Sequence, residues 1–264
     1  ADFKYAQLVA DHIGSKHTEI IVNEDEFFDA IPKVIKNISS YDTTTVRASV
    51  GNYLIGKYIS THSKAKVIFN GDGSDELTGG YMYFHYCPDS MTFDYECKRL
   101  LSNIHHFDGL RSDRCISSHG LESRTPFLDR SFVHAYLTIP AHIRNHNVEK
   151  NIEKFILRNS IAIYDNNLIP QEILWRKKEA FSDGVSSENK SWYEIIQSRV
   201  SQDYNDNIDG IIVNTPITQE QKYYRSVFEK YYYKCGSIIP YFWMPKFCDA
   251  TDSSARTLDV YKKT

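Results

Sequence analysis

The apolar residues near the start of the chain recur with a helical period that a strand-like run interrupts once. Residues 3–13 follow the helical period, and Gly14 then offers a stop. The run 19–22 reads as a short strand. Asn23, with Glu26 three residues later, resembles a capping box at the start of a second amphipathic helix. This alternation is typical of an α/β fold.

The next apolar segments predict a helix that leads into a buried strand. Residues 46–60 have a helical pattern, and residues 66–69 read as a strand that runs straight into Gly71 and Gly73. In open parallel α/β sheets, ligands gather at the carboxyl ends of the strands, where loops converge and the following helices point their positive ends inward. We therefore expect a functional loop at this junction.

The part of the chain after Pro88 is dominated by helical periodicity. Helices are predicted near residues 93–106, 129–137, 148–159 and 191–200. The fold class predicted from the whole pattern is α/β, with a parallel sheet flanked by helices and a mostly helical carboxyl-terminal half. We interpret the tyrosines near the end of the chain as amphipathic packing: Tyr223, Tyr224, Tyr231, Tyr232 and Tyr233.

Composition narrows the class of protein without identifying it. The 264 residues carry a formal net charge of −3, which gives no general attraction to nucleic acid, and no apolar run approaches the roughly 18 residues of a membrane span. The five cysteines form an odd set without a CxxC pair, so no disulfide framework or structural metal site is predicted, and a reducing cytoplasm suits them. The opening at Ala1 has no signal-peptide pattern, so we expect the chain to begin in mid-protein unless processing removed a natural amino terminus.

Residues 70–81, NGDGSDELTGGY, combine glycines with carboxylates at Asp72, Asp75 and Glu76. Glycines let backbone N–H groups approach phosphate oxygens, and hard carboxylate oxygens hold Mg²⁺. The segment contains no GK[ST] phosphate loop, no GxGxxG and no EF-hand register. The residues alone therefore indicate a nucleotide or metal site, with a polar surface loop as the alternative.

Two further segments carry candidate binding residues. Residues 41–49, YDTTTVRAS, place Thr44, Thr45 and Arg47 close together, where hydroxyls and a guanidinium can converge on a carboxylate or phosphate. Capping of the following helix by Thr44 is the alternative. Residues 175–184, WRKKEAFSDG, concentrate three cations, which suit either a solvated basic corner or a clamp on departing pyrophosphate.

The segment HGLESRTPFLDRSF, between these two, contains charged residues of both signs. We interpret Glu122, Arg124 and Asp129 as a buried ion network around Pro126. This network is expected to support the fold rather than to form a site.

Five long segments, in order, resemble successive blocks of the asparagine synthetase family in its eukaryotic-like form: YDTTTVRAS, VIFNGDGSDELTGGYMYFH, HGLESRTPFLD, IPQEILWRKKEAFSDG and YFWMPKFCDATDSSARTL. The resemblance implies an adenine-nucleotide α-hydrolase-like fold and a cytoplasmic, glutamine-hydrolysing, ATP-dependent ligase of asparagine biosynthesis. In that family the β-carboxylate of aspartate attacks the α-phosphate of ATP, pyrophosphate leaves, and ammonia attacks the β-aspartyl adenylate. A homodimer is suggested by the same analogy, and no nucleic-acid or membrane partner is expected.

The resemblance also implies roles for individual residues of this chain. The implied small molecules are ATP, Mg²⁺, aspartate, and ammonia derived from glutamine. The assignments are Asn70 and Gly71 for ATP, Asp75 and Glu76 for magnesium pyrophosphate, Thr44, Thr45 and Arg47 for aspartate and the adenylate, and Asp72 and Lys178 for catalysis.

Two positions depart from the family's usual pattern. Asn70 stands where serine is usual, and Asp72 stands where glutamate is usual. In the family that glutamate is linked to formation and use of the adenylate, and aspartate is shorter by one carbon–carbon bond, about 1.5 Å. Because a displacement of about 1 Å can lower a rate about 100-fold, we expect Asp72 to impair adenylation unless the loop adjusts.

The resemblance places two of the family's features upstream of this chain, namely the SGGLDSS pyrophosphate loop and the amino-terminal cysteine of the glutaminase domain. We therefore expect residues 1–264 to be a partial synthetase domain that is inactive in isolation. Two alternatives stay open: a degenerate synthetase-like protein that binds nucleotide or a partner without catalysis, and an adenylating enzyme with a different acceptor, as in the β-lactam synthetases.

Overall fold

The computed structural model describes residues 2–179, 191–203 and 213–263. The first element is α1 (Asp2–Ile13), as predicted, and α2 (Glu24–Ile38) begins with the expected capping box between Asn23 and Glu26. The predicted strand at 19–22 is wrong, because these residues form an irregular connection. An isolated strand is not stable without a neighbour to complete its hydrogen-bond ladder.

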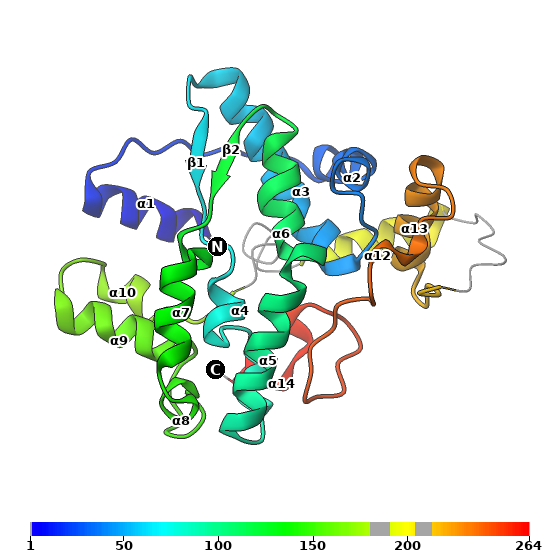
Figure 1. Cartoon of the computed structure of the whole chain (residues 1–264). Helices are drawn as coiled ribbons and strands as arrows, with labels where there is room; N and C mark the ends of the chain where they lie inside the picture. Colours follow the sequence, from blue (N-terminus) through cyan, green and yellow to red (C-terminus); the bar gives the residue numbers. More distant parts are fainter. Residues whose placement is uncertain (1, 180–190, 204–212, 264) are drawn as a thin grey trace.

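The helix predicted after residue 46 is α3 (Thr43–His62), which packs against α2. Two helices from the far end of the chain, α12 (Trp192–Asp203) and α13 (Gln219–Tyr231), complete this helical layer, as the right side of Figure 1 shows. Their shared core is apolar and buried, and it contains Ile31, Val34, Ile35, Ile38, Val46, Val50, Trp192, Ile196, Tyr224 and Phe228. The layer holds the amino-terminal end of α3 in place.

The sheet of the described residues has two parallel strands, β1 (Val67–Phe69) and β2 (Glu122–Arg124). Val67 pairs with Glu122 and Phe69 with Arg124, so that both strands end side by side near the centre of the molecule (Figure 1). The strand predicted at 66–69 is therefore confirmed as Val67–Phe69, and the pairing is parallel as expected, but the strand is not buried, because Val67 and Phe69 are exposed. The described part of the chain is a mostly helical α/β protein. Its sheet has two strands, fewer than the predicted parallel sheet flanked by helices implied.

The segment after β1 forms a second packed unit below the strand ends. It consists of α4 (Ser74–Thr78), η1 (Met82–Tyr86), α5 (Ser90–Asn103), η2 (Ile104–His106), α6 (Asp108–Leu110) and the π-helical turn η3 (Arg111–Cys115). Its core joins η1 and α5 to Trp243 and Leu258 from the carboxyl-terminal segment. The last part of the sequence is thereby packed against η1 and α5.

Short helices follow β2 and lie at the lower left of Figure 1. They are η4 (Pro126–Leu128), α7 (Arg130–Thr138), α8 (Ala141–Arg144), α9 (Phe155–Tyr164) and α10 (Gln171–Leu174). The helix predicted at 148–159 is only half right, because α9 begins at Phe155 after a turn in which Lys154 has a φ of 60°. The chain ends in η5 (Gly236–Ile238), η6 (Ala255–Thr257) and α14 (Asp259–Lys263).

Two smaller expectations also need correction. Glu122 and Arg124 do form an ion pair, but both side chains are more than half exposed, so the predicted buried network is absent at this pair, and Asp129 instead caps α7. Of the tyrosine-rich tail, Tyr231 and Tyr233 are exposed, whereas Tyr223, Tyr224 and Tyr232 pack in or against the first core as predicted. No helix in the described ranges is long and apolar enough to cross a bilayer.

Candidate active site

The loop between β1 and α4 is fixed by a side-chain amide and by a glycine. Asn70 donates from its Nδ2 to Ser123 Oγ at 2.8 Å and accepts from the Asp72 backbone N–H at 3.1 Å. Gly73 has a φ of 90°, and a Cβ at this position would lie 2.3 Å from Leu128 Cδ2, so no other residue fits without displacement. Gly71 is exposed, and a Cβ there would meet no atom within 4 Å, so its backbone is open to a ligand.

Asp75, on the first turn of α4, lies between two lysines that are distant in sequence. Lys154 Nζ is 2.8 Å from Asp75 Oδ1, and Lys178 Nζ is 3.1 Å from Asp75 Oδ2. Burial by itself would raise the pKa of Asp75, but the two lysines lower it well below its ordinary value. Asp75 is therefore ionised, and together with the two ammonium groups it forms a cluster of net positive charge.

Glu76, the next residue of α4, lies in a cluster of oxygen atoms. The Tyr81 hydroxyl lies 2.5 Å from Glu76 Oε1 and 2.8 Å from Asp108 Oδ2. Burial and the adjacent Asp108 carboxylate raise the pKa of Glu76 well above its ordinary value. Burial opposes the charge on Asp108 too, but Arg111 and hydrogen bonds from Glu76 and Tyr81 keep its pKa low. Of the two coupled carboxyl groups, Glu76 therefore holds a proton more tightly than Asp108 does.

Asp72 is anchored to the helix that contains the π-helical turn. Its Oδ1 is 2.6 Å from Arg111 Nη2, and its Oδ2 accepts from Ser112 Oγ at 2.6 Å. Arg111 also pairs with Asp108 at 3.0 Å, so a single guanidinium links Asp72 to the oxygen cluster. Burial raises the pKa of Asp72 in spite of Arg111. π-helical turns occur frequently at functional sites, and this one aligns Arg111 and Ser112 on Asp72.

The carboxylates expected to hold magnesium have other partners here. Both oxygens of Asp75 face ammonium groups, and the Tyr81 hydroxyl is hydrogen-bonded to Glu76 and to Asp108. Among the residues that the structure describes, no group of three or more His, Cys, Asp or Glu side chains is placed to hold a metal ion. In this arrangement Asp75 and Glu76 do not fit a Mg²⁺ site, and no chemical step is assigned to the ion.

The first turn of α3 and Lys178 line the same small cavity. Asp42, rather than Thr44, caps the helix: it accepts from the Thr45 backbone N–H at 2.9 Å and from Thr45 Oγ1 at 2.8 Å. Asp42 also accepts from the Trp243 N–H at 2.7 Å, which fastens the carboxyl-terminal segment to α3. Thr44 Oγ1 is buried, has no hydrogen-bond partner among the described residues, and belongs to a residue that lines the cavity. Of the two predicted threonines, Thr44 is therefore the one with a free hydroxyl.

Arg47 is nearly fully buried and its guanidinium is occupied. Its N–H groups donate to both oxygens of Glu220 at 2.8 and 2.6 Å and to both oxygens of Asp252 at 2.7 and 2.9 Å. A weaker contact at 3.4 Å reaches Ser253 Oγ. Arg47 lines the same cavity as Thr44 and Lys178, but direct contact with a substrate would require it to give up one of these bonds.

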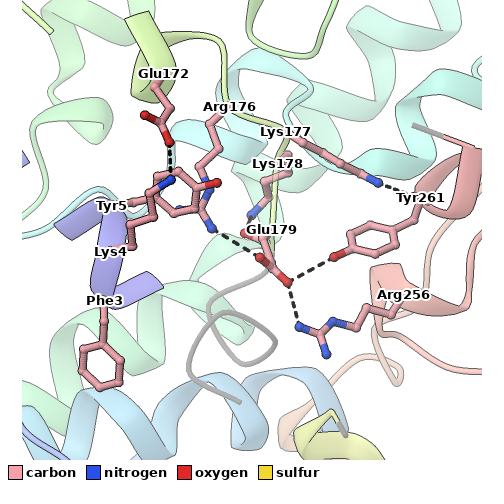
Figure 2. A pocket seen from close by; sticks show the side chains of 10 residues that line it. All are labelled: Phe3, Lys4, Tyr5, Glu172, Arg176, Lys177, Lys178, Glu179, Arg256 and Tyr261. Carbon is pink, nitrogen blue, oxygen red and sulfur yellow. Dashed lines mark hydrogen bonds and ion pairs between the residues drawn. The ribbon is translucent and has the colours of Figure 1, made fainter. Parts of the chain in front are cut away.

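Lys178 also lines a larger basin of about 1100 Å³. Figure 2 shows the side chains that line this basin. Glu179 is bound there by Arg176 at 3.3 Å, Arg256 at 2.7 Å and the Tyr261 hydroxyl at 3.1 Å. Lys4 and Lys177 add further positive charge to the wall. The predicted basic segment therefore lines a basin rich in cations, and residues 180–184 of that segment lie outside the described residues.

The fold brings together Thr44, Asp75 and Lys178, which are far apart in the sequence. The side chains of Asp72, Glu76 and Asn70 are bonded within the protein, to Ser112, Tyr81 and Ser123 respectively. Sequence reasoning missed Tyr81, Asp108, Arg111 and Lys154. Tyr81 belongs to the glycine-rich segment 70–81, but only the tertiary structure brings Asp108, Arg111 and Lys154 into contact with that segment.

Comparison with known proteins agrees with the resemblance. A sequence model of the family described as asparagine synthase matches residues 1–94 and 87–237. Proteins named "Asparagine synthetase [glutamine-hydrolyzing]" from Gallus gallus and Homo sapiens are each 48% identical over 267 aligned positions, covering 99% of this chain and 47% of the relative. The protein of that name from Rattus norvegicus is 46% identical over 269 positions, covering 100% of this chain and 47% of the relative. The chain thus spans about half the length of these curated relatives, and it belongs to the asparagine synthase family.

Proposed function

We propose that this chain is the synthetase part of a protein that converts aspartate to asparagine at the expense of ATP. The observation that supports this most is that Thr44 and Lys178 line the same cavity, where Lys178 pairs with Asp75. Thr44 carries a hydroxyl without a partner among the described residues, and Lys178 also lines a basin rich in cations. Such a site suits a reaction in which a carboxylate meets a phosphate and negative charge leaves on pyrophosphate.

Two steps make up the proposed reaction. An oxygen of the aspartate β-carboxylate forms a bond to the α-phosphorus of ATP, and the bond from that phosphorus to the bridging oxygen breaks, so that pyrophosphate departs with the electron pair. Ammonia then forms a bond to the acyl carbon, AMP leaves with its oxygen, and one proton is lost from nitrogen. The proposed ammonia source is glutamine, which a separate part of the protein would hydrolyse.

The residues divide between the two ends of this reaction. Thr44 would donate its unpaired hydroxyl to aspartate or to the α-phosphate, and Thr45 would hold the helix turn through Asp42. Lys178, released from Asp75, would neutralise the departing pyrophosphate, whose charge the cations of the basin would attract. Gly71 and Asn70 would contact the nucleotide, since the Gly71 backbone is open.

Asp72 and Arg47 keep more limited roles in the proposal. Asp72 would act on the adenylate from its position against Arg111 and Ser112. Arg47 would support the cavity wall through Glu220 and Asp252 rather than bind aspartate directly. Mg²⁺ would accompany ATP as the counter-ion of its phosphates.

We further infer that the two-stranded sheet is part of an adenine-nucleotide α-hydrolase-like sheet and that residues 1–264 form one partial synthetase domain. A homodimer and a cytoplasmic location remain predictions from the family resemblance. Nothing in the comparisons favours the non-catalytic alternative.

The proposed function is tested with the full-length protein that contains this chain. Aspartate, MgATP and ammonium should yield asparagine, AMP and pyrophosphate in equal amounts, and Lys178→Met should reduce the rate about 100-fold or more, as expected for loss of a charge that stabilises a leaving group. Thr44→Val should raise the KM for aspartate. Formation of ADP, or no asparagine at all, would contradict the proposal.

A further inference from the structure

Lys154 is a charged residue beside the proposed site to which neither the resemblance nor the proposed reaction gives a role. It precedes α9, and its ammonium lies 2.8 Å from Asp75 Oδ1 and 3.1 Å from Ser74 Oγ, both on the first turn of α4. Lys178 occupies the other oxygen of the same carboxylate. All three charged side chains are less than one-fifth exposed.

The backbone around Lys154 is built to hold this contact. Lys154 has a φ of 60°, a conformation that is unfavourable for a residue with a side chain. Across from it, Gly80 has no Cβ, and one placed there would lie 2.4 Å from Lys154 Cε and 2.2 Å from Asp75 Oδ1. The lysine stem therefore passes through space that only a glycine leaves open.

The charges explain why a second lysine matters. Asp75 and Lys178 alone would form a neutral pair, in which both carboxylate oxygens could turn to Lys178 and hold it. With Lys154 on Oδ1, Lys178 keeps only Oδ2, and the cluster as a whole carries one uncompensated positive charge. In a partly buried site such a charge is weakly screened, so it acts strongly on an anion nearby.

A purely structural role for Lys154 would not account for this arrangement. A single lysine is enough to neutralise Asp75, and Lys178 already does so. If Lys154 served only to fasten α9 to α4, its charge would be redundant and its loss would leave anion binding unchanged.

We propose that Lys154 is a positioning residue of the leaving-group site. Lys154 holds Asp75, so that Lys178 is free to bind pyrophosphate, and it supplies the net positive charge of that site. The inference rests on the proposed function, because it takes pyrophosphate as the leaving group. Lys154 acts through Asp75 and Lys178 and takes no part in bond making.

The test measures binding of inorganic pyrophosphate to the full-length protein by calorimetry in a Mg²⁺-containing buffer, which requires no turnover. Lys154→Met should weaken pyrophosphate binding about 10- to 100-fold, the range expected for loss of one partly buried charge next to an anion. Lys154→Arg should recover most of the affinity. Lys98→Met is the matched control, because Lys98 is an exposed lysine paired with Asp94 at 2.6 Å on the surface of α5.

Gly80→Ala provides a second variant that keeps every charge. The added methyl group would displace Lys154 Cε and Asp75 Oδ1, so it should weaken pyrophosphate binding in the same direction. AMP binding should stay within about twofold in both variants, since a general loss of structure would weaken AMP and pyrophosphate alike.

The outcomes separate this inference from the proposed function. The role of Lys154 is overturned if the pyrophosphate affinity of Lys154→Met stays within twofold of the wild type. It is also overturned if Lys98→Met lowers the affinity as much as Lys154→Met does. Either result counts against Lys154 even if the protein makes asparagine. A selective loss of pyrophosphate binding in Lys154→Met supports that role even if the wild type makes no asparagine, in which case the proposed function fails instead.

Discussion

The family resemblance assigns Arg47 to substrate binding. A variant of Arg47 tests whether this residue also supports the fold. Its guanidinium joins α3 to Glu220 on α13 and to Asp252 near the end of the chain. The exposed fractions of the Arg47 and Glu220 side chains are 4% and 1%. In Arg47→Met the two carboxylates would stay buried without their cation.

The expected loss follows from this geometry. Removing one partner of a buried ion pair costs about 3–5 kcal/mol, because the remaining charge is neither solvated nor paired. For a domain of this size, that corresponds to a decrease in melting temperature on the order of 10 °C. Arg199→Met is the control, since Arg199 pairs with Glu24 and Asp25 at the surface, where an ion pair contributes about 1 kcal/mol or less.

Thermal unfolding of both full-length variants, followed by tryptophan fluorescence, measures the difference. Trp192 lies in the core that α3 and α13 share, so its emission should report loss of the packing that Arg47 supports. Melting temperatures of Arg47→Met and Arg199→Met within about 2 °C of each other would refute the supporting role of Arg47. A raised KM for aspartate without loss of stability would return Arg47 to direct substrate binding.

Three further predictions concern the carboxylates around α4 and α3. Glu76→Gln should change the free energy of unfolding by less than about 1 kcal/mol, because the amide replaces a protonated carboxyl next to Asp108; a much larger loss in denaturant titration would show that Glu76 is ionised. Burial raises the pKa of Asp42 to about 6, above its unfolded value of 3.8, so the folded state binds the proton more tightly than the unfolded state, and stability falls by about 2 kcal/mol as the pH rises from 4 to 6. Asp42→Asn should flatten that part of the pH–stability curve, and an unchanged slope would contradict the buried ionisation. Asp72→Glu should raise the rate of adenylation by up to about 100-fold while lowering stability by about 1 kcal/mol, since the added methylene must fit against Arg111; a rate equal to or below that of the wild type would exclude impairment by the shorter side chain.

Local patterns predicted the elements whose stability is itself local. The capping box of α2, the helix expected at 46–60 and the strand before Gly71 depend on neighbouring residues, and the structure confirms them. The strand expected at 19–22 failed because its formation requires a pairing partner that the pattern cannot supply. The same limit applies to the loop before α9, where the conformation of Lys154 follows from its contact with Asp75.

The candidate site was predictable only in part for the same reason. The glycine-rich segment revealed Asp72, Asp75 and Glu76 because they lie within five positions of one another. Their partners Asp108 and Lys154 come from separate segments without a distinctive motif, and only the tertiary structure shows that the pKa of Asp75 is lowered while that of Glu76 is raised. Binding of magnesium pyrophosphate by Asp75 and Glu76 was inferred from the family resemblance, whereas Asp75 lies between two lysines and Glu76 lies beside Tyr81 and Asp108.

The most direct test of the proposed synthetase activity is the exchange of isotope-labelled pyrophosphate into ATP by the full-length protein, with and without aspartate. Exchange that depends on aspartate and is lost in Lys178→Met is the predicted result, since it requires reversible formation of the β-aspartyl adenylate and a functioning leaving-group site. Absence of exchange at saturating aspartate and MgATP, or exchange that proceeds equally well without aspartate, would contradict the proposed function.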